Sequence, residues 1–516
     1  MKKLFLFAFI LGLIVTSCGN SKTKKKQETK KPNIVMIYFD DLGYGDVGAY
    51  GSKAIPTPNI DNLAKGGLKF TRGYASSSTC TPSRYALLTG KYPWRNKRAH
   101  ILPGSAPLII GTDELTIPKM LKKQGYQTGI VGKWHLGLGS GNVNWNKHIS
   151  PGPNEVGFDY SFIMAATQDR VPTVFIENGN VLRLEESDPI QISYRKKFPD
   201  ELTGKEHPEL LKLKPSPGQG HDGTIVNGIS RIGHMIGGVK ARWIDENMAD
   251  TFVVRAKHYI KTHKDKPFFL YFALQQPHVP RTPHPRFVGK TDLGPRGDVI
   301  VEGDWCVGEI MKTLKNEGLL DNTLVVLSSD NGPVLDDGYQ DESVKRNGDH
   351  KPWGPFRGGK YSLLEAGTRL PFITYWEGHI KPGVSDAMVS QIDLLNSFAS
   401  LVGSTERSQD GEDLMDVFLG KSNKGRDALG IEATGRTAYR KGDWVMIPPY
   451  RGAAINWVNL PTGNAPVVQL YNLKSDIKQK HNVAEENPEI LNEMIAEYEE
   501  LTGKKVKMKL PPKKKK

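Results

Sequence analysis

Four apolar runs along the chain each end in polar residues. Continuous apolar runs are typical of parallel strands buried on both faces of a sheet. The segments between them have helical spacing, and three end in glycine, as many helices do. The runs are IVMIYFDD (34–41), TGIVGKWH (128–135), PFFLYFALQQPH (267–278) and TLVVLSSDN (323–331), and the helical segments are 59–67, 117–125, 249–263 and 307–318. This alternation predicts an α/β protein with a parallel sheet between helices.

Two regions depart from the alternation and suggest how the chain is divided. Residues 140–245 are long, polar and rich in glycine and proline, which predicts insertions over a binding site, where substrate selectivity would lie. From about residue 426 the pattern predicts short strands in GDWVMI and VVQLYNL and a closing helix in NPEILNEMIAEYEELTG. We therefore expect a catalytic domain over 32–425 and a small α+β subdomain over 426–503.

The N-terminus has the pattern of an export signal. Two lysines precede an apolar run that is short for a membrane span. The ending Val-Thr-Ser-Cys resembles a bacterial lipobox, which implies cleavage before Cys18 and lipidation of that cysteine; the alternative is a plain signal peptide. Residues 1–18 are thus predicted to be a lipoprotein signal peptide and 19–31 a lysine-rich tether. The expected location is the bacterial periplasm or outer membrane, with the lipid anchor as the sole membrane contact.

The formal charge of +14 lies in the two ends of the chain. Residues 1–31 and 504–516 together hold 16 of the 70 basic residues and one of the 56 acidic residues. The body is therefore almost neutral, and the ends are typical of solvated charge runs, including a basic tail over 504–516. This distribution argues against nucleic acid as a partner.

Oxygen-bearing side chains follow two of the predicted strands. Asp40 and Asp41 end the first run, and Asp330 and Asn331 end the last. In open parallel sheets, ligands bind beyond the carboxyl ends of the strands. Hard oxygen donors suit Ca²⁺ or Mg²⁺ and not zinc, so these four residues predict a metal site.

Basic and titratable side chains occur at the same strand ends. Arg84, Lys133 and Lys360 are expected to hold an anion beside the metal, and glycines before Lys360 allow a close approach of the backbone. His135 and His278 are candidates for proton transfer near neutral pH.

The few cysteines exclude a disulfide framework. Cys306 lies in a helical pattern and is expected to be a small core residue. Cys80 precedes Thr-Pro-Ser-Arg at the start of a predicted helix, and its polar neighbours predict an accessible thiol. Because an accessible thiol is prone to oxidation outside the cytoplasm, its presence needs a chemical reason.

Cys80-Thr-Pro-Ser-Arg84 resembles the C-x-P-S-R signature of the type I sulfatases, in which a maturation enzyme oxidises the cysteine to formylglycine (3-oxoalanine). Further blocks resemble the family in the same order: PNIVMIYFDDLGYGDVGAYG, GKWHLG, QQPHVP, LSSDNG, GGKYSLLEAGTRLP and QLYNLKSDIKQKHNVAEENPE. The resemblance covers residues 32–500. It implies an alkaline-phosphatase-like fold, with a mostly parallel sheet sandwiched by helices and a smaller C-terminal α+β domain of antiparallel sheet plus helix.

The resemblance also implies roles for the candidate residues. Formylglycine at position 80, as its hydrate, touches the metal and attacks sulfur. Asp40, Asp41, Asp330 and Asn331 hold Ca²⁺, in preference to Mg²⁺, and Asp330 is a candidate to take the proton of the nucleophile. Arg84, Lys133 and Lys360 neutralise the sulfate oxygens. His278, with Lys360, protonates the departing sugar oxygen, and His135 removes a proton from the second hydroxyl.

The predicted insertion suggests which sulfate ester is cleaved. Its segments TQDRVP and RIGHMIGG, with HKPWGPFRGGKYSLLEAGTR, resemble bacterial exo-acting sulfatases for 6-sulfated galactose or N-acetylgalactosamine. That resemblance implies that Asp169, Arg170 and His221 read the axial O4 of the sugar. Trp353 is either a stacking surface for the sugar or a core residue.

Other functions remain open at this point. They are a sulfatase for another sugar or sulfate position, and a phosphoryl or phosphonate ester hydrolase of the same superfamily. A non-enzymatic alternative is a lipid-anchored sulfoglycan-binding protein in which Cys80 is never matured.

Overall fold

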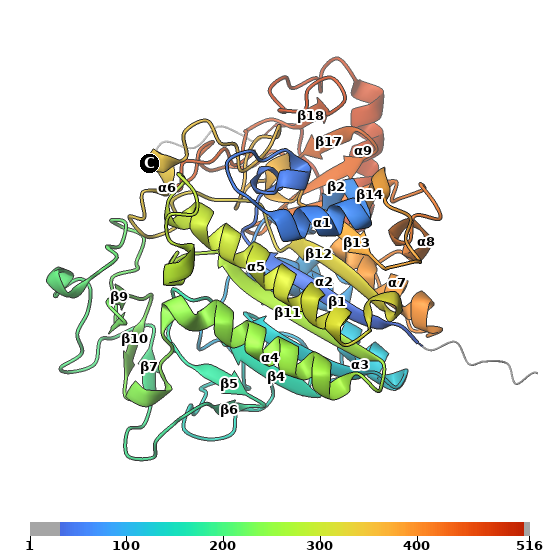
Figure 1. Cartoon of the computed structure of the whole chain (residues 1–516). Helices are drawn as coiled ribbons and strands as arrows, with labels where there is room; N and C mark the ends of the chain where they lie inside the picture. The colour runs from blue at the N-terminus through green and yellow to red at the C-terminus, as the bar shows by residue number, and fades with distance from the viewer. Residues whose placement is uncertain (1–30, 510–516) are drawn as a thin grey trace, which may run out of the picture.

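A ten-stranded, mostly parallel sheet forms the centre of the molecule (Figure 1). The computed structural model describes residues 31–509. The predicted signal peptide with Cys18, nearly all of the tether and the end of the basic tail lie outside the described residues. The strand order is β14-β2-β13-β12-β1-β11-β3-β4-β5-β6. The strands are β1 (Asn33–Asp40), β2 (Leu68–Tyr74), β3 (Gln127–Lys133), β4 (Tyr160–Met164), β5 (Phe175–Glu177), β6 (Asn180–Val181), β11 (Phe268–Pro277), β12 (Thr323–Ser329), β13 (Phe372–Tyr375) and β14 (Gly383–Ser390).

The four apolar runs form the adjacent parallel strands β12, β1, β11 and β3. Every residue of β1, β11 and β12 is buried, as strands covered on both faces require. The parallel register brings Asp40, the last residue of β1, beside Pro277 of β11. Four strand ends that carry chemically active residues therefore meet at one edge.

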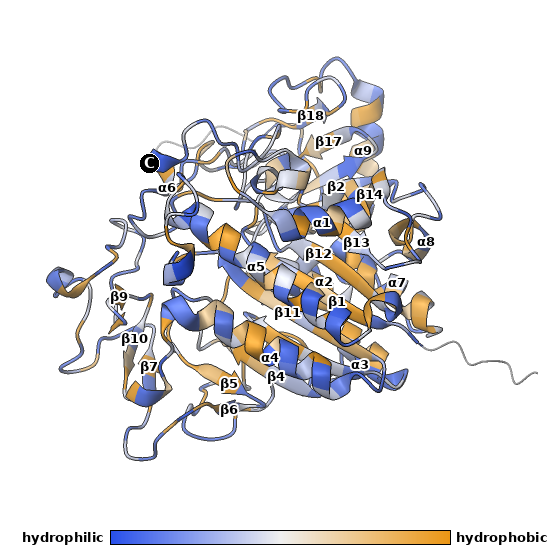
Figure 2. Cartoon of the chain, viewed as in Figure 1, coloured by the Kyte–Doolittle hydropathy of each residue, from blue (hydrophilic) through white to orange (hydrophobic). Residues whose placement is uncertain are grey.

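Helices cover both faces of the sheet. In Figure 1, α1 (Pro58–Gly66), α4 (Met248–His263) and α5 (Pro295–Asn316) cross in front of it. Successive residues of β1 point to opposite faces: Val35 packs with the front helices, and Ile34 with α2 (Cys80–Thr89), α3 (Ile117–Lys123) and α7 (Leu394–Val402) behind. Figure 2 shows apolar residues along the strands of the sheet and a mixture of polar and apolar residues on α4 and α5.

The predicted insertion over 140–245 belongs in part to the main sheet. β4 pairs in parallel with β3, and β5 and β6 follow it in antiparallel pairing at the sheet edge. These strands are short, so their apolar runs give little signal. The rest of the region carries two small sheets, built from β7 (Gln191–Ser193) with β10 (His234–Ile236) and from β8 (Ile225–Val226) with β9 (Ile229–Ser230).

The C-terminal part folds as an antiparallel sheet of four strands with one helix across it. Val445 and Met446 point to opposite faces, the first toward Leu363 and Leu364 and the second toward α9. The elements are β15 (Ala428–Ala433), β16 (Arg436–Lys441), β17 (Trp444–Ile447), β18 (Gln469–Asn472) and α9 (Pro488–Thr502); the short helices α6 (Ser343–Arg346) and α8 (Met415–Phe418) precede them. The predicted fold class is confirmed: a helix-covered, mostly parallel sheet of the alkaline-phosphatase-like type with a smaller antiparallel C-terminal sheet and helix.

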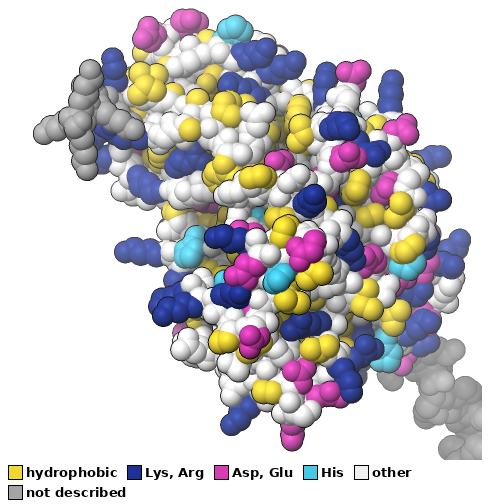
Figure 3. Space-filling model, turned by 90° about the vertical axis from the view of Figure 1, so that its left-hand side faces the viewer, with side chains coloured by type: hydrophobic (Ala, Val, Ile, Leu, Met, Phe, Trp, Pro, Cys, Tyr) yellow, Lys and Arg dark blue, Asp and Glu magenta, His cyan; other side chains and the backbone are white. Residues whose placement is uncertain are grey.

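Basic and acidic side chains are mixed over the face seen in Figure 3. Within residues 31–509, none of the helices combines the length and the apolar character that a membrane span needs. Cys306 is fully buried in α5, as expected of a core residue.

Candidate functional site

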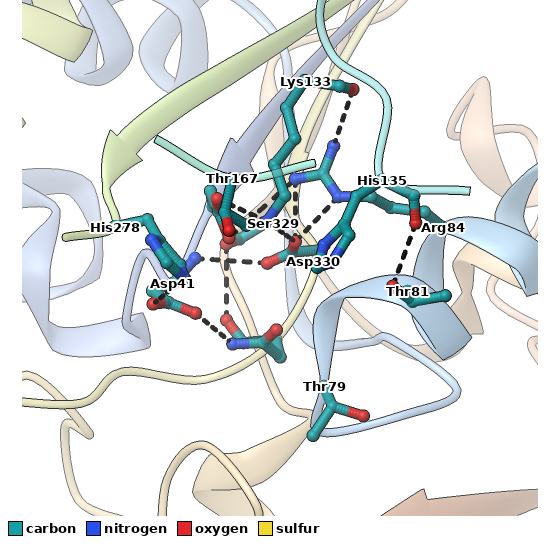
Figure 4. Close-up of polar contacts among 12 residues, drawn as sticks. Asp41, Thr79, Thr81, Arg84, Lys133, His135, Thr167, His278, Ser329 and Asp330 are labelled. Carbon is teal, nitrogen blue, oxygen red and sulfur yellow. Dashed lines mark hydrogen bonds and ion pairs between the residues drawn. The ribbon is translucent and has the colours of Figure 1, made fainter. Parts of the chain in front are cut away.

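The carboxyl ends of β1, β3, β11 and β12 converge on one buried cluster of charges (Figure 4). Asp40, Asp41, Asp330 and Asn331 lie together there, as predicted from the strand ends. The Asn331 amide Nδ2 donates to Asp41 Oδ1 at 2.6 Å, and the Asp41 backbone N donates to Asp330 Oδ1 at 3.2 Å. All four side chains are at most 1% exposed.

This cluster fits a hard cation. Asp40 Oδ1 and Asn331 Oδ1 are buried and have no hydrogen-bond partner among the described residues. A buried oxygen without a partner is costly, and a metal ion would satisfy both atoms. His278, which was not predicted as a metal-binding residue, lies beside this group, since one possible ligand atom each of Asp40, Asp41 and His278 lie within 4.8 Å of one another.

Three cations face these carboxylates. Arg84 Nη2 lies 2.7 Å from Asp330 Oδ2, and Lys133 Nζ lies 2.6 Å from Asp40 Oδ2. Lys360 Nζ lies 2.9 Å from Asp41 Oδ2. The side chains of the three cations are at most 1% exposed, so the structure brings together all the residues predicted for metal and anion binding.

The crowding of charges shifts the protonation equilibria. Burial and the neighbouring Asp330 carboxylate raise the pKa of Asp40 well above its usual range. Burial also raises the pKa of Asp330, but the Arg84 and Lys133 charges outweigh it and leave that pKa below its usual value. Without a metal, negative charge is therefore more favourable at Asp330 than at Asp40.

Both predicted proton-transfer histidines lie at the cluster. His278 Nδ1 faces the Val279 carbonyl at 2.7 Å, which leaves Nε2 pointing toward Asp41 Oδ2 at 4.0 Å. His135 Nε2 faces the Leu102 carbonyl at 2.9 Å, and its buried Nδ1 has no partner within residues 31–509. Burial and nearby cations, Lys133 foremost for His135, lower the pKa of both rings well below the usual value for histidine.

Cys80 is the first residue of α2 and faces the cavity. The expectation of an accessible thiol is wrong, since Cys80 is 2% exposed. Its polar neighbours suggested exposure, but all ten residues of α2 are buried because the helix packs between the sheet and the surrounding loops. Burial raises the pKa of the Cys80 thiol, although the Lys133 and Lys360 charges oppose this.

Strained backbone occurs at three residues of the site. Asp41, His135 and Tyr361 take left-handed conformations, with φ of 66°, 55° and 70°. Such conformations are unfavourable for residues with side chains and cluster at functional sites. Gly359, directly before Lys360, has φ of 157°, and a Cβ there would lie 2.5 Å from the Pro333 carbonyl oxygen, which explains the glycine predicted to allow close approach.

A cavity of about 370 Å³ opens above Cys80. One wall holds Asp169, Arg170 and His221, which the sequence predicted as sugar-binding residues. Arg170 Nη1 donates to Asp169 Oδ1 at 2.9 Å, and His221 Nε2 lies 3.0 Å from Asp169 Oδ2. Burial opposes ionisation of Asp169, but Arg170 and His221 hold the pKa of its carboxyl well below the usual range.

The lining residues that were not predicted include three with aromatic or charged side chains: Asp337, Tyr361 and Trp457. Asp337 Oδ2 accepts from Lys360 Nζ at 2.7 Å, and its Oδ1 accepts from Tyr361 OH at 3.0 Å. The sequence offered a weak signal, because Asp337 lies in a polar loop a few residues after Asp330. Trp353 is partly buried and does not line the cavity, whereas Trp457 does.

We expect Asp337→Asn to lower kcat/KM about 10- to 100-fold, because Lys360 loses a charged partner in a buried site. The measurement is steady-state hydrolysis of a sulfate ester, the reaction that the sequence resemblance implies. Asp336→Asn is the matched control, since Asp336 accepts instead from Ser216 Oγ at 2.8 Å. Equal losses in the two variants would contradict a specific role for Asp337.

Comparisons with known proteins agree with this geometry. The Sulfatase family model matches residues 32–404. The chain is 49% identical over 497 residues to N-acetylgalactosamine-6-O-sulfatase of Bacteroides thetaiotaomicron, covering 95% of this chain and 97% of that protein. It is 33% identical over 409 residues to human arylsulfatase A, covering 78% of this chain and 70% of that protein.

Solved structures give the same result. A Bacteroides thetaiotaomicron sulfatase structure, described in connection with the metabolism of multiple glycosaminoglycans, superposes with a TM-score of 0.90 at 48% identity. It covers 92% of this chain and 100% of that one. A sulfatase from Pseudoalteromonas sp. matches with a TM-score of 0.66 at 25% identity, over 91% of this chain and 90% of that one. The chain therefore belongs to the sulfatase family of enzymes.

Proposed function

We propose that this enzyme is an exo-acting carbohydrate 6-O-sulfatase that releases sulfate from N-acetylgalactosamine or galactose residues. The observation that carries the proposal is the pairing of the buried charge cluster with the Asp169–Arg170–His221 wall in one small cavity. A cavity of about 370 Å³ is at the small end for ligand sites, which favours a single terminal sugar over an internal stretch of polymer. The name of the 49% identical relative supports the same substrate class.

The chemistry needs two groups beyond the standard side chains. Ca²⁺ held by Asp40, Asp41, Asp330 and Asn331 would polarise the sulfate ester and the nucleophile. Formylglycine at position 80, made from Cys80 by a maturation enzyme, would supply the attacking hydroxyl as its hydrate. The position of Cys80 in the cavity lining, beside Lys360 and His278, supports this assignment.

The remaining residues stabilise charge and move protons. Arg84, Lys133 and Lys360 provide fixed positive charge where the sulfate oxygens lie, in a site that excludes bulk water. His278 and Lys360 are together the candidate donors of a proton to the leaving sugar oxygen. Because burial and the Lys360 charge lower the pKa of His278, Lys360 is the member of the pair that carries a proton near pH 7. Asp330 is the candidate acceptor for the proton of the nucleophile, because the Arg84 and Lys133 charges lower the pKa of its carboxyl and keep it ionised.

His135 is the candidate base that would remove a proton from the second hydroxyl of the formylglycine hydrate, the one that does not attack sulfur. Its Nδ1 has no partner among the described residues, and its lowered pKa keeps the ring neutral near pH 7. A neutral imidazole with a free lone pair accepts a proton, as this step needs.

Specificity for the galacto configuration is assigned to the group formed by Asp169, Arg170 and His221. Asp169, Arg170 and His221 present an acceptor and donors held in fixed geometry by their mutual hydrogen bonds. A hydroxyl that bonds to such groups is strongly selected, because an analogue without it leaves buried polar atoms unpaired.

The test is sulfate release by matured protein from a panel of sugars. The panel holds the 6-sulfates of galactose, N-acetylgalactosamine and N-acetylglucosamine, the 2-, 3- and 4-sulfates of galactose, and a sugar phosphate. Release restricted to the two galacto 6-sulfates is the expected result. Release from another position, or equally from the glucosamine sugar, would overturn the substrate assignment, and preference for the phosphate would overturn the reaction.

We expect Asp169→Asn to lower kcat/KM for N-acetylgalactosamine 6-sulfate about 100-fold or more, because the site loses the charge that fixes Arg170 and His221. The measurement compares the galacto and gluco 6-sulfates in both proteins. A loss of the same size for the two sugars would argue against a role in reading O4.

We further propose that the enzyme acts outside the cytoplasm, held by a lipid on Cys18. The support is the lipobox-like sequence followed by the lysine-rich segment. Labelling with a radioactive fatty acid in a bacterial host, with Cys18→Ala as the control, tests this assignment.

A further inference from the structure

Trp457 is a large apolar side chain that stands exposed at the cavity. It lines the cavity although it belongs to the C-terminal subdomain, and it is 65% exposed. Its neighbours in the same loop, Val458 and Leu460, are 6% and 7% exposed. A tryptophan left this exposed beside buried apolar residues, at a polar cavity, is typical of a binding surface.

The loop that carries Trp457 is held in place by its own hydrogen bonds. Asn456 N donates to the Leu460 carbonyl at 2.9 Å, and Leu460 N donates to Asn456 Oδ1 at 2.8 Å. Val458 N also donates to Asn456 Oδ1. Asn456 thus closes a tight turn, and Trp457 lies at its tip.

The same loop is attached to the segment that carries Lys360. Leu363 N donates to the Thr462 carbonyl at 3.0 Å, and Leu460 packs with Val334 and Tyr361 in a small apolar cluster. The rings of Tyr361 and Trp457 have centroids 4.8 Å apart at an angle of 42°. Tyr361 OH also donates a hydrogen bond to Asp337, which accepts from Lys360, so the indole packs on a residue that is linked to Lys360.

The position of Trp457 differs from that of the polar wall. Asp169 and His221 are 2% and 6% exposed and lie within the cavity, whereas Trp457 exposes most of its surface. The cavity has room for about one sugar, so the rest of an oligosaccharide must leave through the opening. An indole at the opening offers a flat apolar face of the kind that packs on the C–H face of a sugar ring.

Resting on the proposed function, we propose that Trp457 forms a second sugar subsite, which binds the glycan residue linked to the sulfated terminal sugar. The subsite takes a neutral or acidic pyranose by stacking and needs no base, metal or ion pair. Trp457 is therefore a specificity-determining residue that favours oligosaccharides over the free sulfated sugar.

The experiment compares two substrates in matured enzyme: N-acetylgalactosamine 6-sulfate, and a disaccharide that carries it at the non-reducing end. The wild type is expected to have the higher kcat/KM for the disaccharide, mainly through a lower KM. Trp457→Ala is expected to reduce the disaccharide-to-monosaccharide ratio of kcat/KM about tenfold, and Trp457→Phe to restore most of it.

The controls separate stacking from a structural effect. Trp305→Ala removes a tryptophan of α5 that does not line the cavity; Arg286 Cζ lies 4.4 Å from the centroid of its ring. This variant is expected to leave the ratio unchanged. An unchanged ratio in Trp457→Ala, an equal fall for both substrates, or a wild-type ratio near one would overturn the subsite. Failure of the wild type to release sulfate from either substrate would overturn the proposed function itself, and the subsite with it.

Discussion

Cys80→Ser is expected to abolish catalytic sulfate release, with kcat about 10³-fold or more below that of matured wild type. Serine places one hydroxyl at the buried start of α2, where Cys80 is 2% exposed. It lacks the second hydroxyl that the hydrate of formylglycine would provide for the expulsion of sulfate. Sulfate release under multiple-turnover conditions is the measurement.

A second cysteine provides the control for this variant. Cys306 is buried in α5 and does not line the cavity, so Cys306→Ala is expected to retain kcat within about threefold. The mass of the peptide containing residue 80 shows whether the wild-type cysteine is converted to the aldehyde. Full activity in protein that holds only the thiol at position 80 would refute the proposed chemistry.

The central strands of the sheet were predictable because each of them is marked by a pattern within its own short stretch of sequence. β1, β11 and β12 are buried along their whole length, so their sequences are continuous apolar runs. Their parallel order then brings Asp40, Lys133 and Asp330 to one edge, which is why polar residues at strand ends predicted the charge cluster.

The unpredicted features depend on contacts between distant segments. Trp457 reaches the cavity from the loop between β17 and β18, and no pattern near residue 457 indicates that. Asp337 can be recognised as a site residue only in the structure, where it accepts hydrogen bonds from Lys360 and Tyr361. The burial of Cys80 was missed for a similar reason, because polar neighbours in sequence say little about packing in three dimensions.

The carboxylates of Asp40, Asp41 and Asp330 are expected to make both activity and stability depend on a bound metal ion. We expect removal of the metal by chelation to lower kcat/KM about 100-fold or more and to lower the melting temperature by a few degrees, and we expect Ca²⁺ to reverse both effects. Asp40 Oδ1 and Asn331 Oδ1 are buried without partners among the described residues, so a cation that binds them stabilises the folded state alone. Activity and thermal unfolding of chelated protein, before and after Ca²⁺ addition, measure the two effects.

Asp40→Asn separates this site from adventitious binding. Burial and Asp330 raise the pKa of the Asp40 carboxyl, so the folded metal-free protein should tolerate the loss of its negative charge. The affinity for Ca²⁺ is expected to fall, because the ion loses a carboxylate ligand. The melting temperature of this variant is therefore expected to respond to Ca²⁺ only at much higher concentration, whereas Asp336→Asn should respond as the wild type does. The proposed metal site would be refuted if Ca²⁺ did not change the melting temperature of the wild type, or if Asp40→Asn responded to Ca²⁺ as the wild type does. Recovery with Mg²⁺ but not with Ca²⁺ would show that the bound metal is Mg²⁺. The thermal readout matters because it reports on the ion even in protein whose Cys80 has not been matured, so loss of metal and loss of the aldehyde cannot be confused.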